Sequence, residues 1–262
     1  MPSALKGKTA FVTGATSGIG RACAQALARE GCPLVLAGRR RERLDALKRI
    51  LGRRLRVDVL PLDVRDRASV EAATRAHPGC FSRAEILVNA AGLARGLSPL
   101  QDGDVSDWEE MIDANLKGLL YVTRQVLPHM IRRGRGHILN LGSTAGHWTY
   151  PNGNVYCATK AGVKALTEGL RMDLLGTGVR VTSVDPGMVE TEFSEVRFHG
   201  DRARAKAVYA GMTPLTPEDV AEIAVFCLSR PGHVNIQQVV VTPTDQASVT
   251  LVHRRTTGKK RP

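Results

Sequence analysis

Aromatic side chains are scarce in this sequence: Phe, Trp and Tyr together make up 4% of its 262 residues. A surface that binds nucleic acid by base stacking needs several exposed rings, so this composition argues against such a partner. The net charge of +12 does not restore that role, because the basic residues are scattered along the chain. The charge then has two interpretations: solvated helix faces with a basic tail, or attraction of small anions.

Cysteine is also sparse and unclustered. The five cysteines lack CxxC spacing, which argues against a metal site or a disulfide framework and suits a reducing compartment. No run approaches the ~18 apolar residues of a membrane-spanning helix, and the first residues lack an apolar signal region. We therefore expect a cytoplasmic protein with no membrane partner and no metal.

What the sequence does contain is a regular alternation of two patterns. Short β-branched runs predict strands at 9–13, 34–37, 57–62, 85–89, 136–141, 180–184 and 238–241. Longer amphipathic stretches predict helices at 18–29, 41–51, 67–76, 105–132, 155–175 and 217–228. Strands that are mostly apolar rather than alternating indicate a parallel sheet buried on both faces. The prediction is an α/β protein with a single-domain, doubly wound, seven-stranded Rossmann-type sheet.

No linker or internal repeat divides the chain. We expect one domain over residues 1–252, followed by a basic tail over 253–262 that is disordered or contacts another subunit. The less regular stretch at about 188–216 follows a strand, which makes it a candidate lid over a substrate.

A glycine-rich turn follows the first predicted strand and opens the first helix. Its candidate phosphate-binding residues are Gly14, Thr16, Ser17, Gly18, Ile19 and Gly20. Glycine lets the backbone turn tightly and approach a pyrophosphate, and the helix N-terminus supplies free N–H groups. The alternative is an ordinary strand–helix loop. The strand before the turn and the helix after it favour a dinucleotide site.

The second strand ends in two arginines, Arg39 and Arg40. Arg39 stands near the position where NAD enzymes place an acid for the ribose 2′-hydroxyl. A guanidinium there can instead bind a 2′-phosphate, so NADP is favoured over NAD. The alternative is a basic first turn of the next helix. Asp63, after the third strand, either accepts from the adenine amino group or caps the helix at 67–76.

Tyr156 and Lys160 are four positions apart in one predicted helix and so share a face. A phenol titrates near ~10, and an adjacent ammonium together with a positive nicotinamide ring is expected to lower the pKa of Tyr156 so that it acts as a base. Ser143, at the end of the fifth strand, can donate to a carbonyl oxygen. Asn115 is unusual inside a helix, and either supports a water-bridged path to Lys160 or is an exposed polar position.

These residues, taken together in order, resemble the classical short-chain dehydrogenases/reductases over 6–244. The resemblance implies Tyr156 as acid/base, Ser143 as carbonyl polariser, Lys160 as activator of Tyr156 and ribose ligand, and Asn115 as relay support. It adds further cofactor residues: Val64, Asn89, Ala91, Gly92, Pro186, Gly187, Val189 and Thr191. One departure is Ala90, where the family usually has asparagine; we expect an adjusted adenosine contact rather than lost activity.

Longer runs, including 38–44, 142–146 and 191–198, resemble the NADP-dependent 3-hydroxy acid dehydrogenases, a tetrameric branch. This implies a small 3-hydroxy acid or the matching semialdehyde as substrate and a homotetramer. A carboxylate substrate needs a cation, which Arg197 can supply unless it is a solvated arginine. We expect His147 and Tyr150 to line the same pocket. The alternatives are a general carbonyl or aldehyde reductase and a non-enzymatic NADP sensor.

Overall fold

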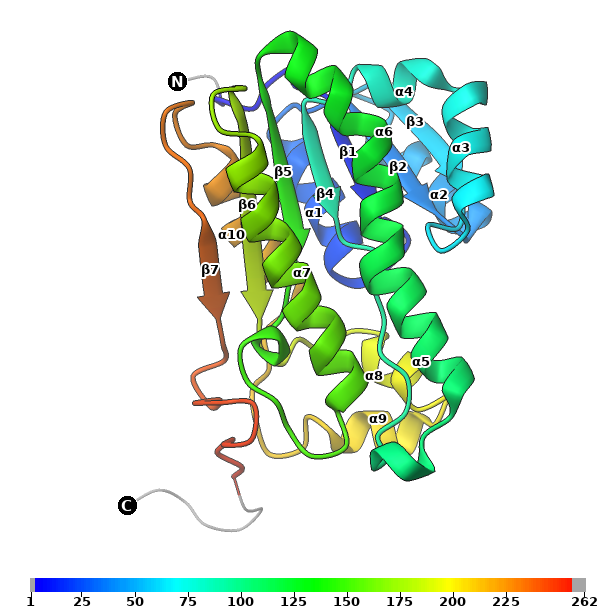
Figure 1. The fold of residues 1–262 in the computed structure, drawn as a ribbon, viewed down its shortest axis with the longest axis vertical. Coiled ribbons are helices and arrows are strands. Elements are labelled where there is room, and N and C mark those ends of the chain that lie inside the picture. The colour runs from blue at the N-terminus through cyan, green and yellow to red at the C-terminus, as the bar shows by residue number, and fades with distance from the viewer. Residues whose placement is uncertain (1–2, 256–262) are drawn as a thin grey trace.

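The computed structural model describes residues 3–255 and contains one sheet of seven parallel strands in the order β3-β2-β1-β4-β5-β6-β7 (Figure 1). The strands are β1 (Ala10–Thr13), β2 (Leu34–Gly38), β3 (Val57–Pro61), β4 (Ile86–Asn89), β5 (Gly136–Leu141), β6 (Val179–Pro186) and β7 (Gln238–Val241). β1, β2 and β4 are buried along their whole length, as expected for a parallel sheet covered on both faces. The predicted Rossmann-type α/β architecture is confirmed.

Helices cover both faces of the sheet. They are α1 (Gly18–Arg29), α2 (Arg41–Leu51), α3 (Arg67–Ala76), α4 (Pro78–Ser82), α5 (Val105–Ile112), α6 (Gly118–Arg133), α7 (Asn154–Asp173), α8 (Phe193–Arg197), α9 (Arg202–Ala207) and α10 (Pro217–Leu228). Apolar residues of α1, α2 and α10 form one core cluster, and those of α3, α4 and α6 form a second. Across residues 3–255, no helix combines the length and apolar character needed to cross a membrane.

The helix expected over 105–132 is interrupted. α5 and α6 are joined by a π-helical turn, Asp113–Lys117, which inserts an extra residue into the helical repeat. Three short helices, α4, α8 and α9, were not predicted, because five or six residues are too few to show a helical period.

The segment 188–216 lies beyond the carboxyl ends of the strands, where α8 and α9 appear below the sheet in Figure 1. Its two ends are joined, since Val189 pairs with Leu215 in an isolated parallel bridge. Of the predicted tail, Arg254 donates to the carbonyls of Val208 and Ala210 in this segment. Residues 256–262 of that tail lie outside the described residues.

Candidate active site

Two adjoining cavities open at the carboxyl ends of the strands. They lie where β1 and β4 are neighbours and the strand order reverses, which is the usual ligand position in open α/β sheets. Their volumes are about 250 and about 260 Å³. Ile19, Gly92 and Thr191 line both, so a ligand can extend from one cavity into the other.

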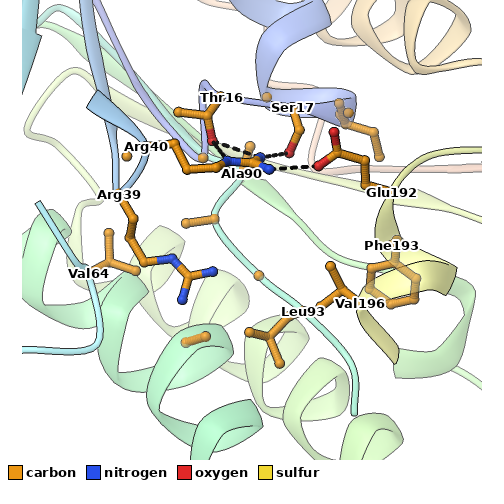
Figure 2. Close-up of a pocket in the computed structure, with 18 of the residues that line it drawn as sticks. Thr16, Ser17, Arg39, Arg40, Val64, Ala90, Leu93, Glu192, Phe193 and Val196 are labelled. Atoms are coloured by element: carbon orange, nitrogen blue, oxygen red, sulfur yellow. Dashed lines mark hydrogen bonds and ion pairs between the residues drawn. The ribbon is translucent and has the colours of Figure 1, made fainter. Parts of the chain in front are cut away.

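The first cavity contains most residues predicted to hold a dinucleotide (Figure 2). They are Gly14, Thr16, Ser17, Gly18, Ile19, Gly20, Arg39, Arg40, Asp63, Val64, Ala91, Gly92 and Thr191. Gly14 has a φ of 66°, and a Cβ on Gly20 would lie 2.4 Å from the Gly14 carbonyl oxygen, so the turn requires glycine at both positions.

The donors around this cavity suit a phosphorylated dinucleotide. α1 begins at the cavity, and its N-cap, Ser17, makes no side-chain capping bond, which leaves the first N–H groups of the helix for phosphate oxygens. Arg39 extends into the cavity and has no hydrogen bond or ion pair with another described residue (Figure 2). A free guanidinium at this distance along the chain from the glycine turn fits a ribose 2′-phosphate.

Asp63 lines the cavity but is already bonded. Its carboxylate accepts from the backbone and side chain of Arg65 at 2.6 to 3.0 Å. Burial acts to raise the pKa of Asp63, but the bonds from Arg65 outweigh it and hold that pKa below its ordinary value. The alternative role as a helix cap is wrong, because Asp66 caps α3 through the N–H of Ala68.

Asn89 does not line the cavity. Its side chain is buried and donates to Asn140 on β5 and to Thr123 on α6, at 2.9 and 3.0 Å. The structure therefore places Asn89 between two strands and a helix, where it joins the central strands, and it offers no side-chain contact to a ligand in this cavity.

The second cavity brings together Ser143, Tyr156 and Lys160. β5 ends two residues before Ser143, and α7 carries the other two on one face. The Ser143 hydroxyl accepts the N–H of Ala145 at 3.1 Å, and its interaction with the phenol acts to lower the pKa of Tyr156. Lys160 Nζ donates to the Leu141 carbonyl at 2.9 Å and lies 6.0 Å from the centroid of the Tyr156 ring.

The electrostatics of Tyr156 differ from the expectation. Burial raises the pKa of Tyr156 above that of a free phenol, and Tyr150 adds to the rise. The cation that opposes this is Arg197, whose guanidinium carbon lies 5.0 Å from the ring centroid. Lys160 is itself buried, which lowers its pKa to about 8. Burial dominates the pKa of Tyr156 in the protein alone, and the lowering expected from Lys160 together with an oxidised nicotinamide ring stays a prediction.

Asn115 is 2% exposed, so the exposed-position alternative is wrong. It lies in the π-helical turn, and its amide closes a pair of bonds with the backbone N–H and carbonyl of Leu93, both at 2.9 Å. The same amide donates to Thr159 on α7 at 3.0 Å. Asn115 thus ties the loop after β4 to the helix that carries Tyr156, while its relay to Lys160 stays a prediction.

Arg197 and Tyr150 lie where the substrate prediction put them, in the second cavity with Pro186, Gly187 and Val189. Arg197 Nη2 donates to the Tyr150 hydroxyl at 2.7 Å. Its guanidinium carbon is also within about 6 Å of the ring centroids of Tyr150 (5.8 Å) and Phe193 (5.2 Å). No carboxylate of the described residues pairs with Arg197, so its charge is available to a bound anion.

His147 does not line this cavity. Its Nε2 atom is 2.6 Å from a carboxylate oxygen of Asp185 on β6, and Gln238 on β7 donates to the same oxygen. The short 3₁₀ turn after Ser143 leads the chain away from the catalytic cavity, and His147 borders a separate hollow. Sequence spacing could not show this, because Asp185 is 38 residues away.

Two aromatic residues that line the second cavity were not predicted. Phe193 packs its edge on Tyr156 with ring centroids 5.6 Å apart, and Tyr209 donates from its hydroxyl to the Val189 carbonyl at 2.8 Å. Both belong to segment 188–216. They are two of the three aromatic residues in this segment, the third being Phe198, and that concentration was the available clue because the chain has so few.

The geometry defines a class of protein. A dinucleotide site at the sheet's switch point, continuous with a cavity that holds a serine, a tyrosine and a lysine, is that of a dinucleotide-dependent oxidoreductase. The family model for short chain dehydrogenases matches residues 8–201, and the chain belongs to that family.

Individual relatives span nearly the whole chain. Sulfoacetaldehyde reductase 2 of Chromohalobacter salexigens is 52% identical over 238 residues, covering 90% of this chain and 94% of the relative. NADP-dependent 3-hydroxy acid dehydrogenase YdfG of Salmonella typhi is 50% identical, covering 93% and 98%. The closed form of a serine dehydrogenase complexed with NADP+ superposes with a TM-score of 0.87 at 47% identity, covering 94% of this chain and 100% of that one.

Proposed function

We propose that this protein transfers hydride between NADP(H) and a small 3-hydroxy acid or the corresponding semialdehyde. The anionic substrate is inferred from Arg197. This residue is a cation without a carboxylate partner among the described residues, and it lies beside Tyr156 in the catalytic cavity. A carboxylate whose 3-hydroxyl reaches Tyr156 would neutralise this charge. Similarity to a 3-hydroxy acid dehydrogenase and to a serine dehydrogenase supports the same class.

The chain's own residues supply binding and proton transfer. A dinucleotide held by the glycine-rich turn and Arg39 would supply the hydride acceptor for oxidation and the hydride donor for reduction. Tyr156 removes the hydroxyl proton in oxidation and donates it in reduction, while Ser143 hydrogen-bonds the substrate oxygen. Arg197 and the positive charge of an oxidised nicotinamide both favour the phenolate, and so offset the effect of burial on Tyr156.

A second candidate is the reduction of a sulfonated aldehyde. The relative from Chromohalobacter salexigens is named for sulfoacetaldehyde, and a guanidinium binds a sulfonate as well as a carboxylate. The alternative of a general reductase is less well supported, because an uncharged aldehyde in this cavity would not neutralise the charge of Arg197.

Segment 188–216, which carries Arg197, is proposed as the lid over this substrate. The protein is further proposed to be a cytoplasmic homotetramer. The five cysteines are free thiols, which suits a reducing compartment. Large apolar side chains such as Phe226 and Val240 are exposed on α10 and on the edge strand β7, where partner subunits can cover them.

The decisive experiment compares Arg197→Gln with the wild type. We expect kcat/KM for 3-hydroxypropionate to fall about 10- to 150-fold further than that for 1-propanol, the value of a hydrogen bond to a charged group, because 1-propanol loses only the effect of Arg197 on Tyr156. Rates are followed at 340 nm with NADP+ and NAD+. Arg202→Gln is the matched control, since Arg202 is in the same segment and pairs with Glu195 at the surface. Equal losses on both substrates would refute the anion site.

A further inference from the structure

A buried carboxylate lies behind the catalytic cavity and has no part in the reaction described so far. It belongs to Asp185, near the end of β6, and its side chain is 2% exposed. Three neighbours donate hydrogen bonds to it: the Ser183 hydroxyl to Oδ1, and the Nε2 atoms of His147 and Gln238 to Oδ2, both at 2.6 Å. A carboxylate so far from water is costly unless an opposite charge lies near it.

The glycine at position 142 lets this carboxylate reach the catalytic end of β5. Leu141 and Val184 are partners in the sheet, and the Gly142 N–H donates to the Val184 carbonyl at 2.9 Å. A Cβ on Gly142 would overlap Asp185 Oδ1, so any side chain at this position would displace the carboxylate. Asp185 therefore lies against the backbone immediately before Ser143.

The ammonium of Lys160 reaches the same stretch of backbone from α7. Lys160 is 8% exposed, and its one hydrogen bond to a described residue is the 2.9 Å bond to the Leu141 carbonyl. A neutral carbonyl offsets only part of the cost of burying an ammonium, which also needs an opposite charge nearby. Because Leu141 precedes Gly142, the buried ammonium and the buried carboxylate approach adjacent residues at the end of one strand.

The electrostatics of Lys160 agree with this placement. Among the described residues, the ionisable groups that face it are Tyr156, whose ring centroid is 6.0 Å from Nζ, and Asp185 on β6, with His147 behind Asp185. Burial lowers the pKa of Lys160 to about 8, and the negative charge of Asp185 opposes that fall. Without this charge the amine would lose its proton at a lower pH.

We infer that Asp185, fixed in place by its three donors, is the buried counter-charge that keeps Lys160 protonated for catalysis. The inference rests on the proposed function, in which Lys160 acts beside Tyr156. Asp185 lines neither the first cavity nor the second, so it touches no ligand there and acts only through Lys160. It is a positioning residue whose effect on the reaction is electrostatic.

The test removes the charge and keeps the shape. In Asp185→Asn the new amide can keep its neighbours, because Oδ1 still accepts from Ser183 while Gln238 and His147 can each turn an acceptor towards Nδ2. The titration of Lys160 is followed by NMR in protein with isotope-labelled lysine, and its signal is assigned from Lys160→Met. We expect the midpoint to move about one pH unit or more lower than in the wild type. The alkaline limb of kcat/KM for 3-hydroxypropionate should move in the same direction.

Two further variants keep the inference falsifiable. Ser183→Ala is the matched control, since it removes a hydrogen bond from the same carboxylate but leaves the charge, and the midpoint of Lys160 should stay at the wild-type value. Gln238→Lys, on the edge strand β7, brings a cation to the carboxylate and should lower the midpoint as well. An unmoved midpoint in Asp185→Asn and Gln238→Lys overturns the inference, as does an equal shift in Asp185→Asn and Ser183→Ala.

The NMR titration needs no substrate, which separates this inference from the proposed function. A wild-type protein that turns over no hydroxy acid, but in which Asp185→Asn lowers the midpoint of Lys160, refutes the proposed substrate and supports the counter-charge.

Discussion

The buried ammonium of Lys160 should reduce stability while it serves catalysis. Burial lowers its pKa from 10.5 to about 8, and each pKa unit corresponds to ~1.4 kcal/mol, so the charged form costs the fold about 3 kcal/mol. Between about pH 8 and pH 10.5 the unfolded chain binds more protons than the folded protein. Stability therefore rises with pH across this window, and the full cost applies below pH 8.

Replacing Lys160 by Met removes this cost. It also removes the bond to the Leu141 carbonyl, worth about 1 kcal/mol, so we expect Lys160→Met to be about 1 to 2 kcal/mol more stable than the wild type at pH 7. The gain should shrink towards pH 10.5, and activity should be lost. Urea denaturation at pH 7 and pH 10 measures the difference, with Lys164→Met, one helical turn further on, as the control. A variant that is equally destabilised at both pH values would refute the reasoning.

Three further outcomes are expected around the loop that follows β4. Arg95→Gln loses a 2.6 Å ion pair with Glu110 and a 2.6 Å bond to the Val196 carbonyl beside Arg197, so KM for 3-hydroxypropionate should rise severalfold while KM for 1-propanol does not. Asn115→Ala leaves the N–H and carbonyl of Leu93 unpaired and should cost about 2 to 4 kcal/mol in urea denaturation. Burial acts to raise the pKa of Glu110, but Arg95 and Arg65 outweigh burial and hold that pKa low. The ion pairs of Glu110 therefore stabilise the fold at neutral pH, and this stabilisation is lost on acidification. Glu110→Gln should therefore cost about 1 kcal/mol at pH 7 and nothing near pH 3.

Local patterns predicted much of the fold. The helices α1, α2, α3 and α10 begin and end at the predicted residues, as do β5 and β7. Each is set by contacts that repeat within a few residues, such as an apolar stripe or a buried strand, and those repeats are visible in the sequence. The serine, the tyrosine and the lysine could be placed in one site because the ends of parallel strands meet at one edge.

What the sequence could not show depends on contacts distant along the chain. Asn115 adopts a π-helical turn because its amide pairs with Leu93, 22 residues earlier. Arg40 pairs with Glu192, 152 residues later, whereas its neighbour Arg39 forms no such pair with a described residue, so the two adjacent arginines differ in role. The sign of the Tyr156 pKa shift depends on burial, which spacing does not encode.

The departure at Ala90 has a structural explanation in the turn after β4. The N–H groups of Ala90 and Ala91 both donate to the Thr13 hydroxyl, at 3.0 and 3.1 Å, and that hydroxyl lies 3.4 Å from the Val88 carbonyl. The turn is thus fixed through backbone groups and a residue of β1, and needs no side chain at position 90. The same turn also requires glycine at position 14, because a Cβ there would lie 2.9 Å from the Ala90 carbonyl oxygen. The two turns thus pack backbone to backbone, and Ala90 lines both cavities with a small side chain.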